Sequence, residues 1–235
     1  MSQPSDSQSI VLAAKNVSKQ VTSPEGNLTI LSDVSFAVER GQSLSIIGAS
    51  GAGKSTLLGL LAGLDLPSAG EIWLNGANLT ALDEDGRAAV RAAHVGFVFQ
   101  SFHLVPSLNA VENVMLPLEL AEHPAPREAA DKILADVGLA PRRSHYPAQL
   151  SGGEKQRVAI ARAFATEPAV LFADEPTGNL DARTGETIID LMFHLNKDSA
   201  TTLVLVTHDR SLAGRCEREI SLDAGRLVSD NKVTA

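Results

Sequence analysis

Short runs of apolar and β-branched residues alternate with segments of helical spacing along the chain, and this alternation predicts an α/β protein. The early part is hairpin-like, because turn signals stand between its apolar runs. The predicted early strands are 10–14, 30–38, 43–48 and 71–74, with turns at Pro24-Glu25-Gly26, Arg40-Gly41 and Asn75-Gly76.

The later part of the chain has a different pattern. Two short and almost wholly apolar runs, 169–174 and 202–207, fit strands that are buried on both faces of a parallel sheet. Between them, residues 183–197 place apolar side chains at helical spacing. The stretch from about 101 to 165 reads mostly as helix and loop interrupted by proline, which indicates a helical subdomain inserted into the sheet protein. Residues 1–9 read as a disordered tail, so that 10–235 form the predicted domain.

Composition sets limits on the function. The 235 residues are 44% hydrophobic and 20% charged, with a net charge of −8, so the chain is long enough for a substantial core and has no general attraction to nucleic acid. No apolar run approaches the roughly 18 residues of a membrane-spanning helix, and the polar N-terminus lacks a signal-peptide pattern. The single cysteine, Cys216, excludes an intrachain disulfide. We therefore expect a soluble intracellular protein without a nucleic-acid partner.

The strongest local motif reads G-A-S-G-A-G-K-S-T and matches the phosphate-binding P-loop, G-x-x-x-x-G-K-[ST]. An apolar strand precedes it and a helix-favouring run follows. Glycines let successive backbone N–H groups point at an anion, and a helix N-terminus adds partial positive charge. Lys54 would reach the outer phosphates, and Ser55 would offer its hydroxyl to Mg²⁺. The predicted nucleotide-binding residues are Gly48, Ala49, Ser50, Gly51, Ala52, Gly53, Lys54, Ser55 and Thr56.

A pair of acids, Asp174 and Glu175, follows directly on the apolar run 169–173. A buried strand delivers such acids to the carboxyl edge of a parallel sheet, where α/β proteins bind ligands. We expect Asp174 to hold Mg²⁺ and Glu175 to orient or deprotonate the attacking water. A solvated strand end or a helix N-terminus explains the pair about as well in isolation, and the P-loop is what favours the catalytic interpretation.

A second motif, Leu150-Ser151-Gly152-Gly153-Glu154-Lys155-Gln156-Arg157, begins a predicted helix over about 152–166. Ser151 and Glu154 fit the capping box S-x-x-E, and a well-capped helix is the plainest explanation of the motif alone. The two glycines change this balance. They cost roughly 1 kcal/mol each relative to alanine in a helix, but they open backbone N–H groups to a closely approaching anion.

This run resembles the signature motif of the ABC transporter ATPases, and the order of the other motifs extends the resemblance over about residues 10–229. By that resemblance Gln100 is the Q-loop glutamine, which binds nucleotide and Mg²⁺. The segment Gly178-Asn179-Leu180-Asp181 is the D-loop, and His208 is the switch histidine. The implied fold is a P-loop NTPase (RecA-like) core with an antiparallel β subdomain and an inserted helical subdomain that contains the signature.

The resemblance also implies an ATPase that binds ATP and Mg²⁺ and acts as a head-to-tail dimer of two copies. Each ATP would lie between the P-loop of one copy and the signature helix of the other. Asp181 would lie at the interface between the copies. The residues implied to complete the site in trans are Ser151, Gly152, Gly153 and Glu154, and the implied catalytic residues are Lys54, Glu175 and His208.

One position departs from the family pattern. Many members stack adenine on an aromatic residue ahead of the P-loop, but Val21 stands at that position here, and the nearest aromatic before the P-loop is Phe36. Stacking of a base on an aromatic ring contributes roughly 1–3 kcal/mol, and a valine offers less contact area. We therefore expect only a modest preference for ATP over GTP in a nucleotide competition assay.

Two segments, 94–114 and 173–181, resemble the lipoprotein-release and macrolide-export branch of the family. That branch implies an integral-membrane permease partner with a large extracytoplasmic domain, which would hold the ATPase at the cytoplasmic face of a bacterial inner membrane. The implied cargo is lipoprotein, lipid or a hydrophobic compound. Two alternatives stay open: a non-transport ABC ATPase, and a regulatory P-loop ATPase without a permease. The residues that would contact the permease, or else cover the subdomain's own core, are Phe102, Leu104, Val105 and Leu108.

Overall fold

The computed structural model describes residues 10–23 and 26–233, so the tail predicted at 1–9 lies outside the described residues. The described chain forms two compact units. The first unit combines the segments up to Arg91 and from Thr202 onwards, and the second comprises Ala92–Thr201. Among the described residues, no helix has both the length and the apolar character needed to span a membrane.

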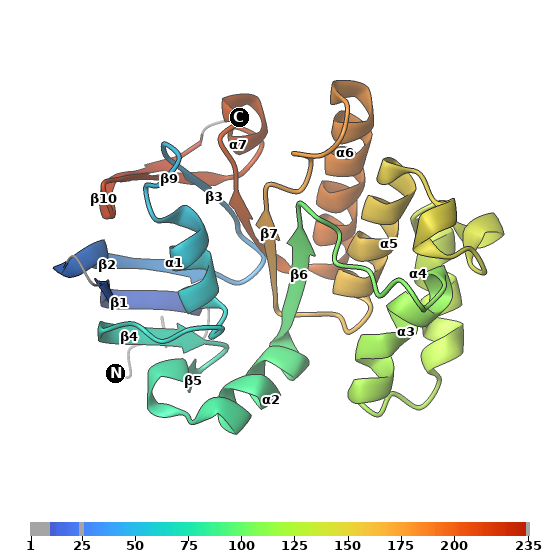
Figure 1. The fold of residues 1–235 in the computed structure, drawn as a ribbon, viewed down its shortest axis with the longest axis horizontal. Coiled ribbons are helices and arrows are strands. Elements are labelled where there is room, and N and C mark those ends of the chain that lie inside the picture. The colour runs from blue at the N-terminus through green and yellow to red at the C-terminus, as the bar shows by residue number, and fades with distance from the viewer. Residues whose placement is uncertain (1–9, 24–25, 234–235) are drawn as a thin grey trace, which may run out of the picture. The chain divides into compact units, whose positions relative to one another are not determined.

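Four strands of the first unit form an antiparallel sheet in the order β2-β1-β4-β5, which confirms the predicted antiparallel β subdomain (Figure 1). β1 extends well beyond the predicted range of 10–14. Asn16 takes a left-handed conformation, and register shifts between Ala14 and Lys19 let the strand continue where the apolar alternation breaks. The strands are β1 (Ile10–Ser23), β2 (Gly26–Glu39), β4 (Ala69–Leu74) and β5 (Ala77–Asn78).

The other strands of the first unit lie in the order β10-β9-β3-β8. β3 pairs in parallel with β8 and β9, and β10 pairs antiparallel with β9. β3 is almost wholly buried and leads into the P-loop, after which α1 begins. The predicted strand, phosphate loop and helix are therefore confirmed as consecutive elements. The elements of this part of the first unit are β3 (Ser43–Ile47), α1 (Lys54–Leu61), β8 (Thr202–Val206), α7 (Arg210–Ala213), β9 (Arg218–Asp223) and β10 (Arg226–Lys232).

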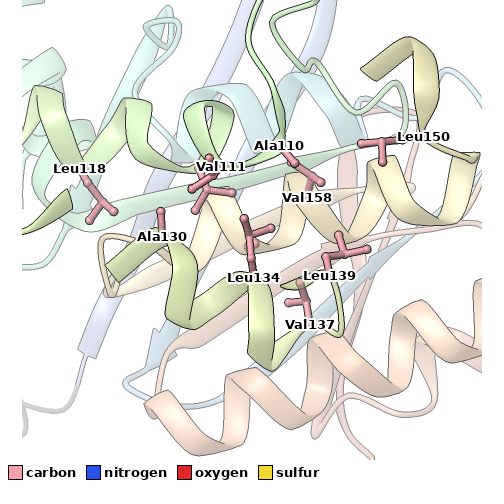
Figure 2. Packing of buried hydrophobic residues seen from close by; sticks show 11 residues of the cluster. Ala110, Val111, Leu118, Ala130, Leu134, Val137, Leu139, Leu150 and Val158 are labelled. Carbon is pink, nitrogen blue, oxygen red and sulfur yellow. The ribbon is translucent and has the colours of Figure 1, made fainter. Parts of the chain in front are cut away.

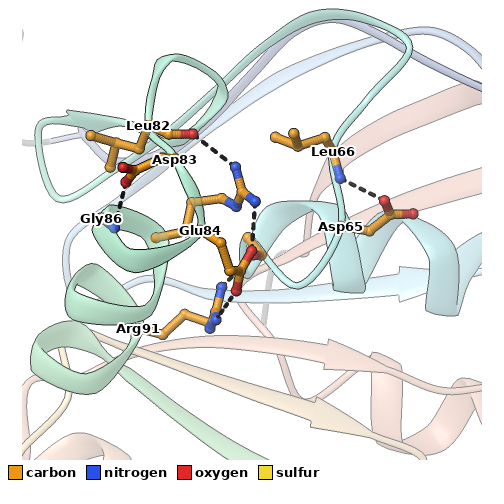
Figure 3. A network of polar contacts seen from close by, with 9 residues as sticks. Asp65, Leu66, Leu82, Asp83, Glu84, Gly86 and Arg91 are labelled. Carbon is orange, nitrogen blue, oxygen red and sulfur yellow. Dashed lines mark hydrogen bonds and ion pairs between the residues drawn. The ribbon is translucent and has the colours of Figure 1, made fainter.

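The helix α2 (Glu84–His94) follows the antiparallel sheet and is anchored by a polar network (Figure 3). Glu84 accepts hydrogen bonds from Arg91 and Arg87, and these bonds lower the pKa of the Glu84 carboxyl. Arg91 also donates to the backbone carbonyl of Gly63, just beyond α1. Arg91 thus joins α2 to the end of the helix that follows the P-loop.

The second unit contains two parallel strands and the helices α3 to α6 (Figure 1). Phe99 in β6 lies opposite Asp174 in β7, so the carboxyl ends of the two strands are side by side. α3, α4 and α5 fall within the segment 101–165 that reads as helix and loop. The elements are β6 (Val95–Phe99), α3 (Ala110–Leu120), α4 (Pro126–Asp136), α5 (Gly152–Phe164), β7 (Val170–Asp174) and α6 (Ala182–Ser199).

A hydrophobic cluster joins α3, α4 and α5 (Figure 2). Full burial of a Val, Leu or Ile side chain contributes roughly 1.5–3 kcal/mol, so this cluster is the main source of packing energy for these three helices. Leu104, from the loop after β6, packs against it from outside. The cluster consists of Ala110, Val111, Val114, Leu118, Ala130, Leu134, Val137, Leu139, Leu150, Val158 and Ala161.

Candidate functional site

The P-loop is shaped by its own lysine. Lys54 is the first residue of α1, and its ammonium group donates to the carbonyl oxygens of Gly48, at 2.8 Å, and Ala49, at 2.9 Å. The side chain therefore folds back across the loop and holds it closed. Because the first N–H groups of a helix have no intrahelical partner, they and the Lys54 ammonium together place positive charge at this loop.

Two glycines of the P-loop are required by close packing. A Cβ atom on Gly48 would lie 2.4 Å from the carbonyl oxygen of Leu222 in β9. A Cβ atom on Gly53 would lie 2.8 Å from Leu31 Cδ2 in β2. Both glycines also have positive φ angles, 155° and 96°. Their predicted role is to free the backbone for phosphate binding, and their contacts give a second reason: the loop is held against two neighbouring strands.

Three further predicted residues of the first unit are exposed. Ser55 is exposed in the first turn of α1, and Val21 is 39% exposed near the end of β1. His208 is exposed in the segment between β8 and α7. The residue after it, Asp209, caps α7 by accepting a hydrogen bond from the Ser211 amide at 2.8 Å. The capping residue thus fixes the backbone immediately beyond the histidine.

In the second unit, the ends of β6 and β7 bring together the predicted carboxylates and Gln100. Asp174 is the last residue of β7, and Glu175 follows it with a positive φ of 46°. Gln100 follows β6 and donates through Nε2 to Asn179 Oδ1 at 3.3 Å, while Asn179 Nδ2 donates to the Gln100 carbonyl at 2.9 Å. The Q-loop glutamine is therefore held by the asparagine of the D-loop, a partner that the sequence did not predict for it.

The signature helix begins with the predicted capping box. Ser151 is the N-cap of α5, and its hydroxyl accepts a hydrogen bond from the Glu154 amide at 3.3 Å. The Glu154 carboxylate accepts from the Ser151 amide at 2.8 Å and from Arg142 Nε at 3.1 Å. The bonds from Ser151 are the main reason that the pKa of Glu154 is lowered. Glu154 therefore orders the start of α5 as a carboxylate.

The two signature glycines pack against the segment that follows β7. A Cβ atom on Gly153 would lie 2.6 Å from Thr184 Cγ2, and one on Gly152 would lie 3.2 Å from Leu180 Cδ2. Asp181 is the N-cap of α6 and accepts from the Thr184 amide at 3.0 Å. Hydrogen bonds to Thr184 lower the pKa of Asp181. The glycines and the aspartate thus have local structural roles in addition to the predicted roles at a dimer interface.

Two residues of α5 that were not predicted as site residues hold the neighbouring loops, and one of them, Gln156, stands within the signature motif. Gln156 is completely buried, and its Nε2 donates at 2.6 Å to the carbonyl of Pro176, directly after Glu175. Arg162 donates to the carbonyls of His103, at 2.6 Å, and Phe102, at 2.9 Å, and burial lowers the pKa of its guanidinium. One helix therefore carries the signature and fixes the segments after both Gln100 and Glu175.

The loop that Arg162 holds is conformationally unusual. Phe102 and His103 have positive φ angles of 61° and 48°, which are uncommon for residues other than glycine and a true outlier for a bulky one. Strain of this kind costs on the order of 1–3 kcal/mol per residue and persists only where surrounding contacts impose it. The two hydrogen bonds from Arg162 are such contacts.

The donor set suits Mg²⁺. The Ser55 hydroxyl in the first unit, and the Asp174 carboxylate and Gln100 amide oxygen in the second, are hard oxygen ligands of the type that this ion selects. Gln100 uses its amide nitrogen toward Asn179, which leaves the amide oxygen as an acceptor. When bound, Mg²⁺ would neutralise phosphate charge. The chemistry of each of these donors therefore suits the predicted ion.

Comparison with known proteins places these motifs in one family. Residues 31–178, more than half of the chain, match the family model described as ABC transporter. The chain belongs to this family: it is an ATP-binding cassette with a P-loop NTPase core, and its activity is ATP hydrolysis coupled to transport.

Particular relatives match over nearly the whole chain. The chain is 52% identical over 222 residues to the uncharacterized ABC transporter ATP-binding protein YbbA of Escherichia coli K12, covering 94% of this chain and 97% of that protein. It is 45% identical over 225 residues to the lipoprotein-releasing system ATP-binding protein LolD of Coxiella burnetii, with 94% and 97% covered. A dimeric structure of the ATP-binding cassette MJ0796 bound to ADP and Pi matches with a TM-score of 0.87 at 39% identity, covering 95% and 99%. The predicted branch of the family is thereby confirmed.

Proposed function

We propose that two copies of this chain close head-to-tail on ATP and drive an integral-membrane permease with a large extracytoplasmic domain. The complex would work at the cytoplasmic face of a bacterial inner membrane and move lipoprotein, lipid or another hydrophobic compound. The likeness to LolD supports the branch, and the dimeric MJ0796 cassette supports pairing of two such chains. Closure would act on the permease mechanically, because the chain carries the nucleotide site and the cargo site lies elsewhere.

The proposed chemistry divides the site residues by role. Lys54 and the P-loop amides would hold the β- and γ-phosphates, and Asp174 would hold Mg²⁺ with Ser55 and Gln100. Glu175 would orient the attacking water and accept its proton. His208 would contact the γ-phosphate. Phosphoryl transfer needs mainly positioning and stabilisation of charge, and the fixed amide groups of the P-loop and of the signature helix supply both.

The start of α5 is the observation on which the dimer proposal rests. A second helix of the same unit begins with the same kind of capping box, so the signature can be compared with a cap that has no proposed role at an interface. Asn109 caps α3 in the same way: it accepts from the Glu112 amide at 3.0 Å, and Glu112 accepts from the Asn109 amide at 2.8 Å. Ser151 and Asn109 are thus equivalent as caps. They differ only if Ser151 also contacts a phosphate held by a second copy.

This equivalence gives a matched test in a Glu175→Gln background, where ATP is not consumed. Ser151→Ala and Asn109→Ala each remove a cap, at a cost of about 0.5–2 kcal/mol in stability. We expect Ser151→Ala to abolish the ATP-dependent dimer in analytical ultracentrifugation and Asn109→Ala to retain it. ATP binding to the monomer stays intact in both. Equal dimerisation of the two variants contradicts a role of the signature in trans.

The permease would contact the loop after Gln100. Phe102 is half-buried there, whereas Leu104 packs against the hydrophobic cluster of α3 to α5. A charged residue in place of Leu104 would therefore disturb the packing of the helices. A charged residue in place of Phe102 is the change that tests contact with the permease. We expect wild-type protein to co-purify an integral-membrane protein from detergent-solubilised membranes of its host, and Phe102→Asp to lose it while still binding ATP.

A control variant is available in the same unit. Leu120 is 76% exposed at the end of α3, and Leu120→Asp should keep the membrane partner. Mass spectrometry of the captured protein then decides the class. A permease with a large extracytoplasmic domain supports the proposal. Failure of the wild-type protein to capture any integral-membrane protein favours the non-transport or regulatory ATPase, and retention of the permease by Phe102→Asp removes this loop as the docking segment.

A further inference from the structure

The turn between β9 and β10 lies at a junction of three backbone segments in the first unit. Ala224 and Gly225 form this turn, and both have positive φ, 45° and 76°, as a two-residue turn of a twisted hairpin requires. The Gly225 amide donates to the carbonyl of Ala52 in the P-loop at 3.2 Å. Its carbonyl accepts from the amide of Ser32 in β2 at 2.9 Å. One peptide segment therefore links the P-loop to β2.

The junction is too tight for any side chain at this position. A Cβ atom on Gly225 would lie 2.2 Å from the carbonyl oxygen of Ile30 and 3.2 Å from Leu31 Cα. Those atoms belong to the backbone of β2 and cannot move aside as a side chain can. The P-loop approaches the same place, because a Cβ on Gly53 would lie 3.0 Å from the Ile30 carbonyl oxygen. β2 is thus set against the P-loop and the turn at one point.

The far end of the hairpin formed by β1 and β2 carries an apolar pair. Val21 in β1 lies directly opposite Leu28 in β2, and side chains of such partners project from the same face of the sheet. Val21 is 39% exposed and Leu28 57% exposed. Leu28 is two residues before Ile30, the residue against which Gly225 packs. Displacement of β2 at the junction would therefore move this pair.

We propose that Gly225 is a positioning residue for nucleotide binding, which fixes the hairpin of β1 and β2 relative to the P-loop so that Val21 and Leu28 together form the apolar contact for the base. The proposal rests on the nucleotide site proposed above. Gly225 itself does not touch the nucleotide. In this proposal the P-loop binds the phosphates and the hairpin binds the base, so Gly225 sets the distance between these two binding segments.

This division predicts a difference between two ligands. ATP needs both the P-loop and the hairpin, whereas tripolyphosphate lacks a base and needs the P-loop alone. We expect Gly225→Ala to weaken binding of ATP with Mg²⁺ by about tenfold, on the scale of the loss of one apolar side-chain contact with the base. Tripolyphosphate binding should change by less than roughly threefold. Isothermal titration calorimetry measures both on the intact chain.

A matched control separates two effects of Gly225→Ala: the collision of the new Cβ atom with β2, and the strain of an alanine with a positive φ angle. Gly76 lies in the turn between β4 and β5 with a similar φ of 83°, but a Cβ atom there meets nothing within 4 Å. Gly76→Ala therefore carries the same left-handed strain without displacing β2, and it should bind both ligands like the wild type. Equal loss of ATP and tripolyphosphate in Gly225→Ala, or no loss relative to Gly76→Ala, overturns the proposal.

A second pair of variants tests the base contact without touching the junction. Leu28→Ser removes an exposed apolar side chain. It should weaken the binding of ATP and leave the binding of tripolyphosphate unchanged. Val228→Ser, at a 59% exposed position of β10, should change neither. Unchanged ATP affinity in Leu28→Ser removes the hairpin as the base contact. If wild-type protein binds neither ligand, or if Lys54→Ala binds both as the wild type does, the proposed nucleotide site itself has failed, which is a separate result.

Discussion

Glu175→Gln will retain ATP and lose its hydrolysis, with a rate that falls by about 100- to 10,000-fold, the range that a general base contributes. The glutamine amide has the shape of the carboxylate but cannot accept a proton from water. Glu175 stands directly after β7 in a left-handed conformation, φ 46°, and strained positions of this kind cluster at functional sites. Because glutamine keeps the backbone and the chain length, the change isolates the carboxylate. Phosphate release at saturating ATP measures the rate.

We expect the same variant to accumulate as a dimer on ATP, since in the proposed cycle the dimer reopens only after hydrolysis. Analytical ultracentrifugation with and without ATP detects this change. Glu119→Gln, at an exposed position of α3, is the matched control and should hydrolyse ATP like the wild type. Hydrolysis by Glu175→Gln at the wild-type rate would show that another group activates water, and the role of Glu175 would then be limited to ordering the turn after β7.

Lys54→Ala is expected to weaken ATP binding by about 10- to 100-fold. A hydrogen bond to a charged group contributes roughly 1.5–3 kcal/mol, and 1.4 kcal/mol corresponds to a factor of ten. In the structure the ammonium group is held by the carbonyls of Gly48 and Ala49, so the truncation also removes two contacts that close the loop. Calorimetric titration with ATP and Mg²⁺ measures the affinity, and the melting temperature shows whether the fold survives.

Lys132→Ala provides the comparison for charge alone. Lys132 is exposed on α4, in the second unit, so its removal changes the net charge by the same amount without touching the P-loop. We expect its ATP affinity to match the wild type. If Lys54→Ala and Lys132→Ala bind ATP equally well, the lysine of the P-loop makes no net contribution to phosphate binding, and the neighbouring backbone amides would have to supply it.

The sequence predicted some elements closely for a physical reason. β3, β7 and β8 are short apolar runs with a motif or a turn at one end, so burial and chemistry both mark their limits. α2 has no comparable signal. Its sequence, EDGRAAVRAAH, consists mostly of alanine and charged residues. Its anchor is the hydrogen bond from Arg91, which Glu84 holds within the helix, to the Gly63 carbonyl just beyond α1. No local periodicity contains that long-range contact.

The candidate site shows the same division. Residues of the P-loop, the carboxylate pair and the signature could be predicted because phosphate and metal chemistry restricts residue type at fixed spacing. The contacts of Gln156, which stands within the signature motif, and of Arg162 could not be predicted, because their partners are backbone carbonyls 20 to 60 residues away in the chain. Gly225 is a further case, since its requirement for glycine comes from Ile30 on another strand. Carbonyl groups are present at every residue, and so they leave no mark in a sequence.

The capping box at Ser151 restricts which residue types can stand at this position. The cap occupies a lone pair of the hydroxyl, which accepts from the Glu154 amide, while the hydroxyl proton remains a donor. Capping and the proposed recognition of phosphate therefore draw on opposite polarities of one group and do not compete. Aspartate is as good a cap as serine, but as a carboxylate it has no proton to donate and would repel the anion. An aspartate at this position would keep the helix and exclude the nucleotide.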